Sequence, residues 1–336
     1  MAYEGEELSA DAILKIASGF RTAKVLASAV ELGLFTLLDD GPKTATELCA
    51  TLGLHERAGR HFLSALNGLG MLRLTDGRYE NTALAGRYLT PRAGAGLDAF
   101  VGFLDHDLAP AWTGLTEALR AGRRPDRAGD PYLEQYDDPA GRERFLAAMD
   151  WLNAPISAEL AKLDWHEVTS FVDVGGARGN AAAHLVREHP HLRGIVFERP
   201  EVWPEFDGHM RRLGLAGTVE FEGGDFFADA LPKADVVVFG HVLHNWGDEE
   251  RNLLLGKAND ALPPGGKVIV YDPMIDEADG RIAAAIASLN MLVWSAGGSE
   301  YSRDECRAML TGHGFDVESV FEAGPVDTVV VARKRG

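Results

Sequence analysis

Cysteine is scarce in this sequence: only Cys49 and Cys306 occur among 336 residues. The two are far apart and each stands alone, so they form neither a paired metal motif nor a disulfide framework. Such cysteine usage is typical of proteins that work in a reducing compartment. We therefore expect a cytoplasmic protein.

A basic leader and long hydrophobic runs are missing as well. The first seven residues, MAYEGEE, are acidic, whereas a secretory signal begins with a basic stretch followed by an apolar one. The most apolar stretches are short or interrupted by polar residues, which argues against a transmembrane helix. We expect neither secretion nor a membrane partner.

Positive charge is in short supply. Lys and Arg number 33 against 51 Asp and Glu, a formal net charge of −18 at pH 7. Nucleic acids and anionic membranes require a basic surface, so this balance argues against both as partners. It is compatible with a cationic ligand, and equally with acidity that serves only solubility.

The N-terminal part of the chain has the pattern of a winged helix. Residues 11–38 carry apolar positions at helical spacing, and the capping box 44–47 (Thr-Ala-Thr-Glu) opens a short helix. After another helix, two short strands at 71–74 and 78–81 flank Asp76-Gly77, a strong hairpin signal. A winged helix can bind DNA, but this domain is not basic, so we favour a structural or dimer-forming role.

From Ser170 onward, segments with strand character alternate with helical segments. The expected strands are 171–174, 194–197, 219–221, 235–239, 267–271, 317–321 and 328–332. The alternation predicts an α/β fold with a mostly parallel, doubly wound sheet, and the last two strands put an antiparallel edge on it. We expect three regions: a winged-helix domain in 1–95, a helical connector in 96–165 and a Rossmann-like domain in 166–336.

A glycine-rich turn follows the first expected strand of the sheet. The segment Asp173-Val174-Gly175-Gly176-Ala177-Arg178-Gly179-Asn180 opens a helix, and glycines there let the backbone approach a ligand closely. A dinucleotide site needs Gly-x-Gly-x-x-Gly. Counted from Gly175 or from Gly176, the required positions hold Ala177 and Arg178 instead of glycine. Because the turn lacks the glycine spacing of a dinucleotide site, it argues against an NAD-dependent oxidoreductase.

The next two strands end in residues suited to a nucleoside. Glu198 ends the second strand at about the distance where an acidic residue binds ribose hydroxyls. The third ends in Gly223-Gly224-Asp225-Phe226-Phe227, where we expect Asp225 to accept from an adenine amino group and Phe226 to flank the ring. Taken singly, these residues also fit a surface acid and a core aromatic. Because ligands of open α/β sheets bind at the carboxyl ends of the strands, the three ends together predict one site.

His244 lies at the carboxyl end of the fourth strand, in the segment 239–246 (FGHVLHNW). A phenol, with a pKa of about 10, is a poor nucleophile at neutral pH, whereas a histidine can take its proton. His241 and His244 also suggest a metal pair, but residues three apart on a strand point to opposite faces, and no third ligand is apparent. We expect a general base and no metal.

Two carboxylates are candidates for orienting His244. Asp272 ends the next strand, and Glu300 follows Gly297-Gly298-Ser299. Either can keep one imidazole nitrogen protonated so that the other faces a substrate. The alternatives are a loop-capping role for Asp272 and a solvated Glu300.

These residues resemble the S-adenosylmethionine (SAM)-dependent O-methyltransferases that include plant caffeate-type and bacterial aromatic-polyketide enzymes. The resemblance covers nearly the whole chain. Its most specific parts are Asp173-Val174-Gly175-Gly176, Gly223-Gly224-Asp225-Phe226-Phe227, and Leu243-His244-Asn245-Trp246 followed by Asp248-Glu249. It implies a class I methyltransferase Rossmann-like sheet, and an N-terminal winged helix that forms an intertwined homodimer and does not bind DNA.

The resemblance also assigns roles to individual residues. His244 is implied to be the catalytic base, framed by Asp272 and Glu300. The implied cofactor-binding residues are Asp173, Gly175, Gly176, Glu198, Gly224, Asp225, Phe226, Gly240 and Trp246. The implied substrate-binding residues are Phe145, Met149, Asn290, Met291 and Trp294.

Three positions depart from the family pattern. The family commonly has Asp after the catalytic histidine, where this chain has Asn245, and Asp at the ribose position, where it has Glu198. It often has a third glycine where Ala177 stands. Glutamate keeps the ribose chemistry, whereas Asn245 alters the hydrogen bonding beside the base.

The sequence therefore predicts a SAM-dependent O-methyltransferase that methylates a phenolic hydroxyl of an aromatic natural product, with a bacterial polyketide as the expected acceptor class. A few members of the family perform decarboxylation or hydroxylation, so changed chemistry is the first alternative. A ligand-sensing winged-helix regulator is the second. The acceptor and its regiochemistry are not readable from the sequence.

Overall fold

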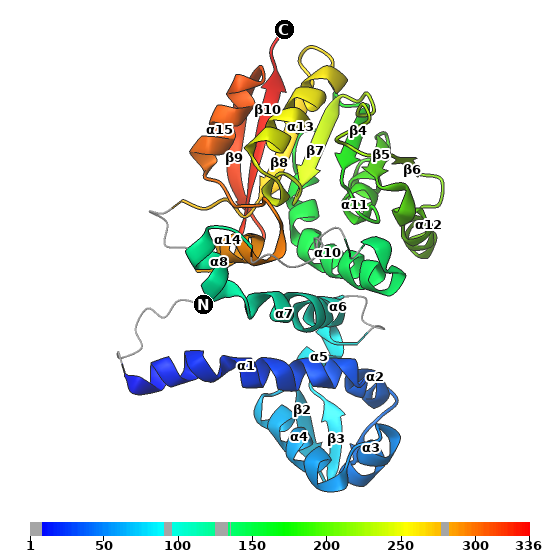
Figure 1. Ribbon diagram of the computed structural model, residues 1–336. Helices are drawn as coiled ribbons and strands as arrows, with labels where there is room; N and C mark the ends of the chain where they lie inside the picture. The colour runs from blue at the N-terminus through cyan, green and yellow to red at the C-terminus, as the bar shows by residue number, and fades with distance from the viewer. Residues whose placement is uncertain (1–8, 91–95, 125–133, 135, 277–281) are drawn as a thin grey trace. The chain divides into compact units, whose positions relative to one another are not determined.

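The structure is a computed structural model that describes residues 9–90, 96–124, 134, 136–276 and 282–336. The chain forms two compact units, Met1–Asp107 and Leu108–Gly336, whose elements are labelled in Figure 1. The segment 96–165, expected as a separate connector, is divided between the two units.

The first unit consists of helices around a small sheet. Its elements are α1 (Ala10–Glu31), α2 (Leu34–Leu38), β1 (Lys43–Thr44), α3 (Ala45–Thr51), α4 (Glu56–Gly68), β2 (Leu72–Thr75), β3 (Arg78–Asn81), α5 (Ala83–Tyr88), α6 (Leu97–Phe103) and the π-helix η2 (Leu104–Leu108). The strands lie in the order β1-β3-β2, all antiparallel. The expected hairpin is confirmed, with Thr75 opposite Arg78 next to the turn.

Local signals account for most boundaries in this unit. The Thr44–Glu47 capping box is present, with each side chain bonded to the other residue's backbone amide. The prediction of one helix over 11–38 is wrong: α1 ends at Glu31, and Gly33 has a φ of 67°. Glycine tolerates this left-handed conformation, which lets the chain turn before α2.

The second unit contains the large sheet. Its elements are α7 (Ala109–Trp112), α8 (Leu115–Ala121), α10 (Pro139–Leu160), β4 (Ser170–Val174), α11 (Asn180–Glu188), β5 (Arg193–Glu198), η3 (Pro200–Val202), α12 (Trp203–Arg212), β6 (Val219–Gly223), β7 (Val236–Gly240), η4 (Leu243–Asn245), α13 (Asp248–Ala261), β8 (Lys267–Asp272), α14 (Ile282–Trp294), α15 (Arg303–Gly312), β9 (Phe315–Ala323) and β10 (Asp327–Lys334).

The seven strands lie in the order β6-β5-β4-β7-β8-β10-β9. The first five pair in parallel, and β10 pairs antiparallel with both β8 and β9, as the sequence predicts for the final hairpin. Because β4 to β8 run in one direction, the residues that follow them gather at one edge of the sheet. The residues predicted to bind the cofactor come from this edge, as do His244 and Asp272.

Helices cover both faces of the sheet. Leu254 and Leu310, from α13 and α15, pack with Val237 and Val268 on one face. The other face is covered by α10, α11 and α12. Among the described residues, every helix is too short or too polar to cross a membrane.

Candidate active site

The turn after β4 is built for close backbone approach. Gly175 has a φ of 69°, and a Cβ there would lie 2.8 Å from Cγ2 of Val242. Ala177 also adopts the left-handed region, with a φ of 51°, a conformation that glycine adopts more readily than alanine. The backbone therefore forms a narrow cradle at the start of α11.

Two cavities open at the carboxyl edge of the sheet. The glycine-turn cavity is lined by residues that include Asp173, Gly175, Gly176, Gly240, His241, Phe145 and Met149. The aromatic cavity is lined by residues that include Gly224, Asp225, Phe226, Phe227 and Trp246. Glu198 and Phe226 line both. All nine residues predicted to bind the cofactor thus line one cavity or both, and their roles stay predictions.

Glu198 lies where the two cavities meet. Its Oε2 accepts a hydrogen bond from the Ala177 amide at 3.1 Å, and its Oε1 accepts one from the Arg199 amide at 2.8 Å. Burial raises the pKa of Glu198 to about 7, although these two amides favour the charged form. Burial, together with the charge of Glu198, also raises the pKa of Asp173 to about 7. Ligand groups that donate hydrogen bonds to these carboxylates would favour their charged forms.

Aromatic side chains shape the other cavity. Phe227 and Trp246 meet edge to face, with ring centroids 4.7 Å apart, and Phe226 lies 5.9 Å from Trp246. Asp225 is exposed, and its Oδ1 accepts a hydrogen bond from the Phe227 amide at 2.8 Å. A flat, partly polar group such as adenine suits this combination of rings and a carboxylate.

The segment after β7 brings two histidines together. The prediction that His241 and His244 point to opposite faces is wrong, because the strand ends at Gly240 and His241 has a φ of 53°. A short 3-10 helix, η4, follows and places the two rings in a stack, with centroids 5.5 Å apart. The alternation of side chains holds only within a strand.

His244 is held by a carboxylate, as the base-and-orienter hypothesis requires. Its Nδ1 lies 2.7 Å from Oε1 of Glu300 and 3.7 Å from Oδ1 of Asp272. Burial lowers the pKa of His244 to about 4 and raises the pKa of Glu300 to about 8. Since the two groups share a hydrogen bond, the pair titrates as a unit. In the form with the proton on Nδ1, the lone pair lies on Nε2.

Asp272 is buried beside this pair. The hydroxyl of Tyr301 donates to its Oδ2 at 2.5 Å. Burial raises the pKa of Asp272 to about 6, while the nearby His244 opposes that rise. The alternatives of a loop-capping Asp272 and a solvated Glu300 are wrong, because both carboxylates are buried beside His244.

Arg251, which the sequence interpretation missed, holds this arrangement together. Its Nε donates to the Leu243 carbonyl at 3.0 Å, and its Nη2 donates to the Ser299 carbonyl. The Ser299 amide in turn donates to the His244 carbonyl at 2.9 Å. The cation therefore joins the segment of the base to the segment of Glu300. A buried arginine on α13 has no local sequence signal.

A second missed arginine fixes the helix that lines the glycine-turn cavity. Arg178, in the glycine turn, donates from Nε to Asp150 at 2.5 Å and from Nη1 to Glu143 at 2.9 Å. Both acids belong to α10, which also carries Phe145 and Met149. Burial raises the pKa of Asp150 to about 6, against the effect of Arg178. The clamp sets the register of α10 against the turn.

The remaining predicted substrate residues lie on α14. Met291 and Trp294 are buried, and Asn290 accepts a hydrogen bond from Nε1 of Trp112 on α7 at 3.0 Å. None of the three lines either cavity. Their contact with a substrate stays a prediction, and Asn290 has a structural partner already.

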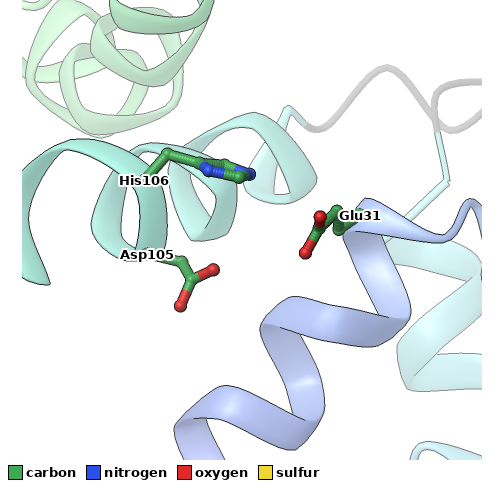
Figure 2. Close-up of side chains that lie close together, drawn as sticks. All are labelled: Glu31, Asp105 and His106. Atoms are coloured by element: carbon green, nitrogen blue, oxygen red, sulfur yellow. The ribbon is translucent and has the colours of Figure 1, made fainter.

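Groups able to hold a metal occur elsewhere. In the described part of the chain, Glu31, Asp105 and His106 of the first unit place ligand atoms within 4.8 Å of one another (Figure 2). Oδ2 of Asp105 is already 2.6 Å from the ammonium of Lys24. His241 and His244 belong to no group of three such residues there. Because the rings of His241 and His244 are stacked, their nitrogens point along separate lines and not toward one shared metal ion.

Comparison with known proteins decides the family. The O-methyltransferase domain family matches residues 112–316, and the O-methyltransferase dimerisation domain family matches residues 14–91. The chain belongs to the O-methyltransferase family. It is 45% identical to the tetracenomycin polyketide synthesis 8-O-methyltransferase TcmO of Streptomyces glaucescens, over 96% of each chain. This O-methyltransferase is also 39% identical to the N,N-dimethyltransferase OxyT of Streptomyces rimosus, over 92% of this chain and 91% of that one.

A solved structure extends the likeness to the whole fold. Human N-acetylserotonin methyltransferase, crystallised with SAM, matches with a TM-score of 0.90 at 26% identity, over 100% of both chains. The expected Rossmann-like sheet and N-terminal dimerisation domain are therefore confirmed. The protein is a SAM-dependent O-methyltransferase.

Proposed function

We propose that this enzyme methylates a phenolic hydroxyl of an aromatic natural product, with His244 as the general base. The observation that carries this proposal is the buried hydrogen bond of 2.7 Å between Nδ1 of His244 and Glu300. It keeps the proton on Nδ1 and leaves the lone pair of Nε2 to accept the proton of a phenol.

The cavities offer the residues that would hold SAM. The close approach of backbone at Gly175 and Gly176 provides a cradle in which a Cβ would collide with neighbouring side chains. Glu198 would accept from the ribose hydroxyls, and Phe226 and Trp246 would flank the adenine. When bound, SAM supplies a methyl group activated by its sulfonium.

The chain itself orients the acceptor and removes its proton. Phe145 and Met149 line the cavity beside the glycine turn and would place an aromatic ring in line with the methyl donor. Such positioning supplies much of the acceleration, and Nε2 of His244 takes the phenolic proton as the oxygen is alkylated. This chemistry requires no metal.

An aromatic polyketide is the proposed acceptor class. The support is the 45% identity to TcmO, whose name describes 8-O-methylation in tetracenomycin polyketide synthesis. A bacterial biosynthetic enzyme of this kind would work in the cytoplasm. Both cysteines are free and buried, which fits a reducing setting.

Product analysis tests the proposal directly. The enzyme is incubated with SAM and a panel of polycyclic aromatic polyketides that carry free phenols, with and without a chelator. Mass spectrometry and NMR should show a gain of one methyl group on oxygen, unaffected by chelation. Methylation on nitrogen, decarboxylation or hydroxylation would contradict the proposal, and catalase and reductant controls exclude adventitious oxidation.

We also propose that the enzyme is a homodimer through its dimerisation domain. Helix α1 exposes large apolar side chains, with Ile13 at 70%, Ile16 at 64% and Phe20 at 71%, and such a patch marks an association surface. Light scattering should give a dimer for the wild type and a monomer for Phe20→Asp. Leu253→Asp, at an exposed apolar position of α13, is the matched control and should stay dimeric.

A further inference from the structure

The second histidine beside the base has a carboxylate partner of its own. Nε2 of His241 lies 2.7 Å from Oδ1 of Asp327, the first residue of β10, and both side chains are buried. The rings of His241 and His244 are stacked, with 25° between their planes. Two imidazole–carboxylate pairs therefore lie side by side, and His241 also lines the glycine-turn cavity.

The backbone is held in an uncommon conformation to produce this arrangement. His241 has a φ of 53°, a region that residues other than glycine rarely adopt and that surrounding contacts must maintain. One such contact comes from Asn245, whose Nδ2 donates to the His241 carbonyl at 2.8 Å. A second is Tyr271, whose ring meets the His241 ring edge-on at 5.4 Å.

Charged and titratable groups surround the two rings from several elements. They are Tyr271 and Asp272 of β8, Glu300 and Tyr301 of the segment before α15, Asp327 of β10, Arg251 of α13 and, across the cavity, Asp173 of β4. Asp272 and Asp327 favour the protonated form of His244, whereas its burial and the cation of Arg251 favour the neutral form. A protonated His244 cannot act as a base, so the negative charge of Asp327 beside it needs a nearby positive charge to balance it.

His241 has the properties of that positive charge. Burial by itself lowers the pKa of His241, but the charge and hydrogen bond of Asp327, joined by Asp272 and Glu300, raise it above the usual value. His241 in turn lowers the pKa of His244. The protonated form is therefore favoured at His241, and the neutral form is favoured at His244.

We propose that His241 and Asp327 form a positioning pair for His244: the stacked ring of His241 holds the base in place, and the charge of His241 balances that of Asp327, so that the pair adds no net charge beside the base. The proposal rests on the proposed function of His244 as the base. It assigns His241 no contact with the reacting atoms.

The wild-type enzyme provides the first test. NMR titration with ¹³C-labelled histidine, assigned through His241→Gln and His244→Gln, follows both rings without any acceptor. His241 should stay protonated above pH 6.5, the ordinary value for histidine, while His244 stays neutral at that pH. A His241 that loses its proton well below pH 6.5 would overturn the proposal.

Three variants separate charge from packing. His241→Gln leaves Asp327 uncompensated and should raise the pKa of His244 by about 1 to 3. Asp327→Asn should leave that pKa unchanged or lower it, and the double variant should return it close to the wild-type value, because the ion pair carries no net charge. If the pair acted only through packing, both single substitutions would shift the pKa of His244 in the same direction. If Asp327→Asn does not fold, the wild-type titration and His241→Gln still decide.

Kinetics distinguish this proposal from the proposed function. In His241→Gln, the acid limb of the pH profile of kcat/KM should move to higher pH, measured at saturating SAM because His241 lines the cavity proposed for the cofactor. If His244→Ala keeps full turnover, the assignment of the base fails, whereas the coupling of the two rings measured by NMR would still stand. If His244→Ala loses turnover but the profile of His241→Gln does not move, only the positioning pair is refuted.

Discussion

The two ends of the site are built in different ways. At the end proposed to bind the cofactor, Gly175 directly follows β4, Glu198 ends β5, and Asp225 comes just after Gly224 beyond the end of β6. The aromatic cavity there is open enough that Asp225 is exposed. At the catalytic end, His244 is buried with carboxylates that come from β8, from the segment before α15 and from β10. The first end is assembled by strand order, and the second by contacts between distant segments.

This difference separates binding from chemistry. Strand ends need only the sheet to be formed for the cofactor residues to meet. The catalytic cluster needs several buried charges to balance, and a single missing partner leaves another charge buried and uncompensated. Substitutions at the catalytic end should therefore reduce turnover or stability, while those at the cofactor end should change affinity.

The largest effect is expected at His244. His244→Ala should lower kcat by about 10² or more, because it removes the proposed general base, with the Kd of SAM nearly unchanged by calorimetry. Asp225→Ala is the matched comparison and should weaken SAM binding while the bound enzyme still turns over. A His244→Ala variant that loses SAM affinity, or keeps its kcat, would contradict the separation of cofactor binding from chemistry.

Asn245 comes next. Its Nδ2 donates to the His241 carbonyl at 2.8 Å in a buried position, and a carboxylate cannot donate there. Asn245→Asp should lower the free energy of unfolding by about 1 to 3 kcal/mol, measured by urea denaturation. Asn245→Ala, which loses the hydrogen bond without adding charge, should cost less. Equal stability of wild type and Asn245→Asp would refute this role.

The pH dependence of SAM binding tests the cofactor end. Glu198 and Asp173 have pKa values of about 7, and hydroxyl donors favour the charged carboxylate. Affinity should therefore be full above pH 7 and fall as the pH drops through 7, by about tenfold between pH 8 and pH 6. Glu198→Gln should bind more weakly and with a flatter dependence. A wild-type affinity that rises as the pH falls would contradict the ribose role.

The smallest effect is expected at Ala177. Its φ of 51° costs a residue with a Cβ about 1 to 2 kcal/mol, and a substitution to glycine would remove that strain. Glycine also increases the entropy of the unfolded chain, which lowers the stability by about 0.4 to 1 kcal/mol. Ala177→Gly should raise the free energy of unfolding by at most about 1.5 kcal/mol, with SAM affinity unchanged. A clear loss of stability in thermal unfolding would show that the turn is not strained.

The same contrast explains what could be predicted from the sequence. The sequence places the glycine turn, Glu198 and Asp225 at one edge of the sheet, because each has a local signal at a strand end and parallel order brings strand ends together. The Thr44–Glu47 capping box and the β2–β3 hairpin could be predicted for the same local reason. Base-and-orienter logic named Asp272 and Glu300 as candidate partners of His244, but it could not choose between them.

The rest of the catalytic end was missed for a physical reason. Nothing in the sequence around Asp327 or Arg251 indicates burial beside a histidine, because those contacts span more than a local window. The left-handed turn at His241 also reversed the direction expected from strand alternation. Tertiary packing, and not local pattern, selects these positions.

The place of β10 in the sheet has a consequence for synthesis. It is the last strand of the sheet in the sequence, yet it lies between β8 and β9. Until β10 leaves the ribosome, β8 is an open edge with unpaired backbone groups, and such edges invite association with other chains. Because β10 also brings Asp327, a nascent enzyme would acquire its finished sheet and its complete set of active-site charges in one late event.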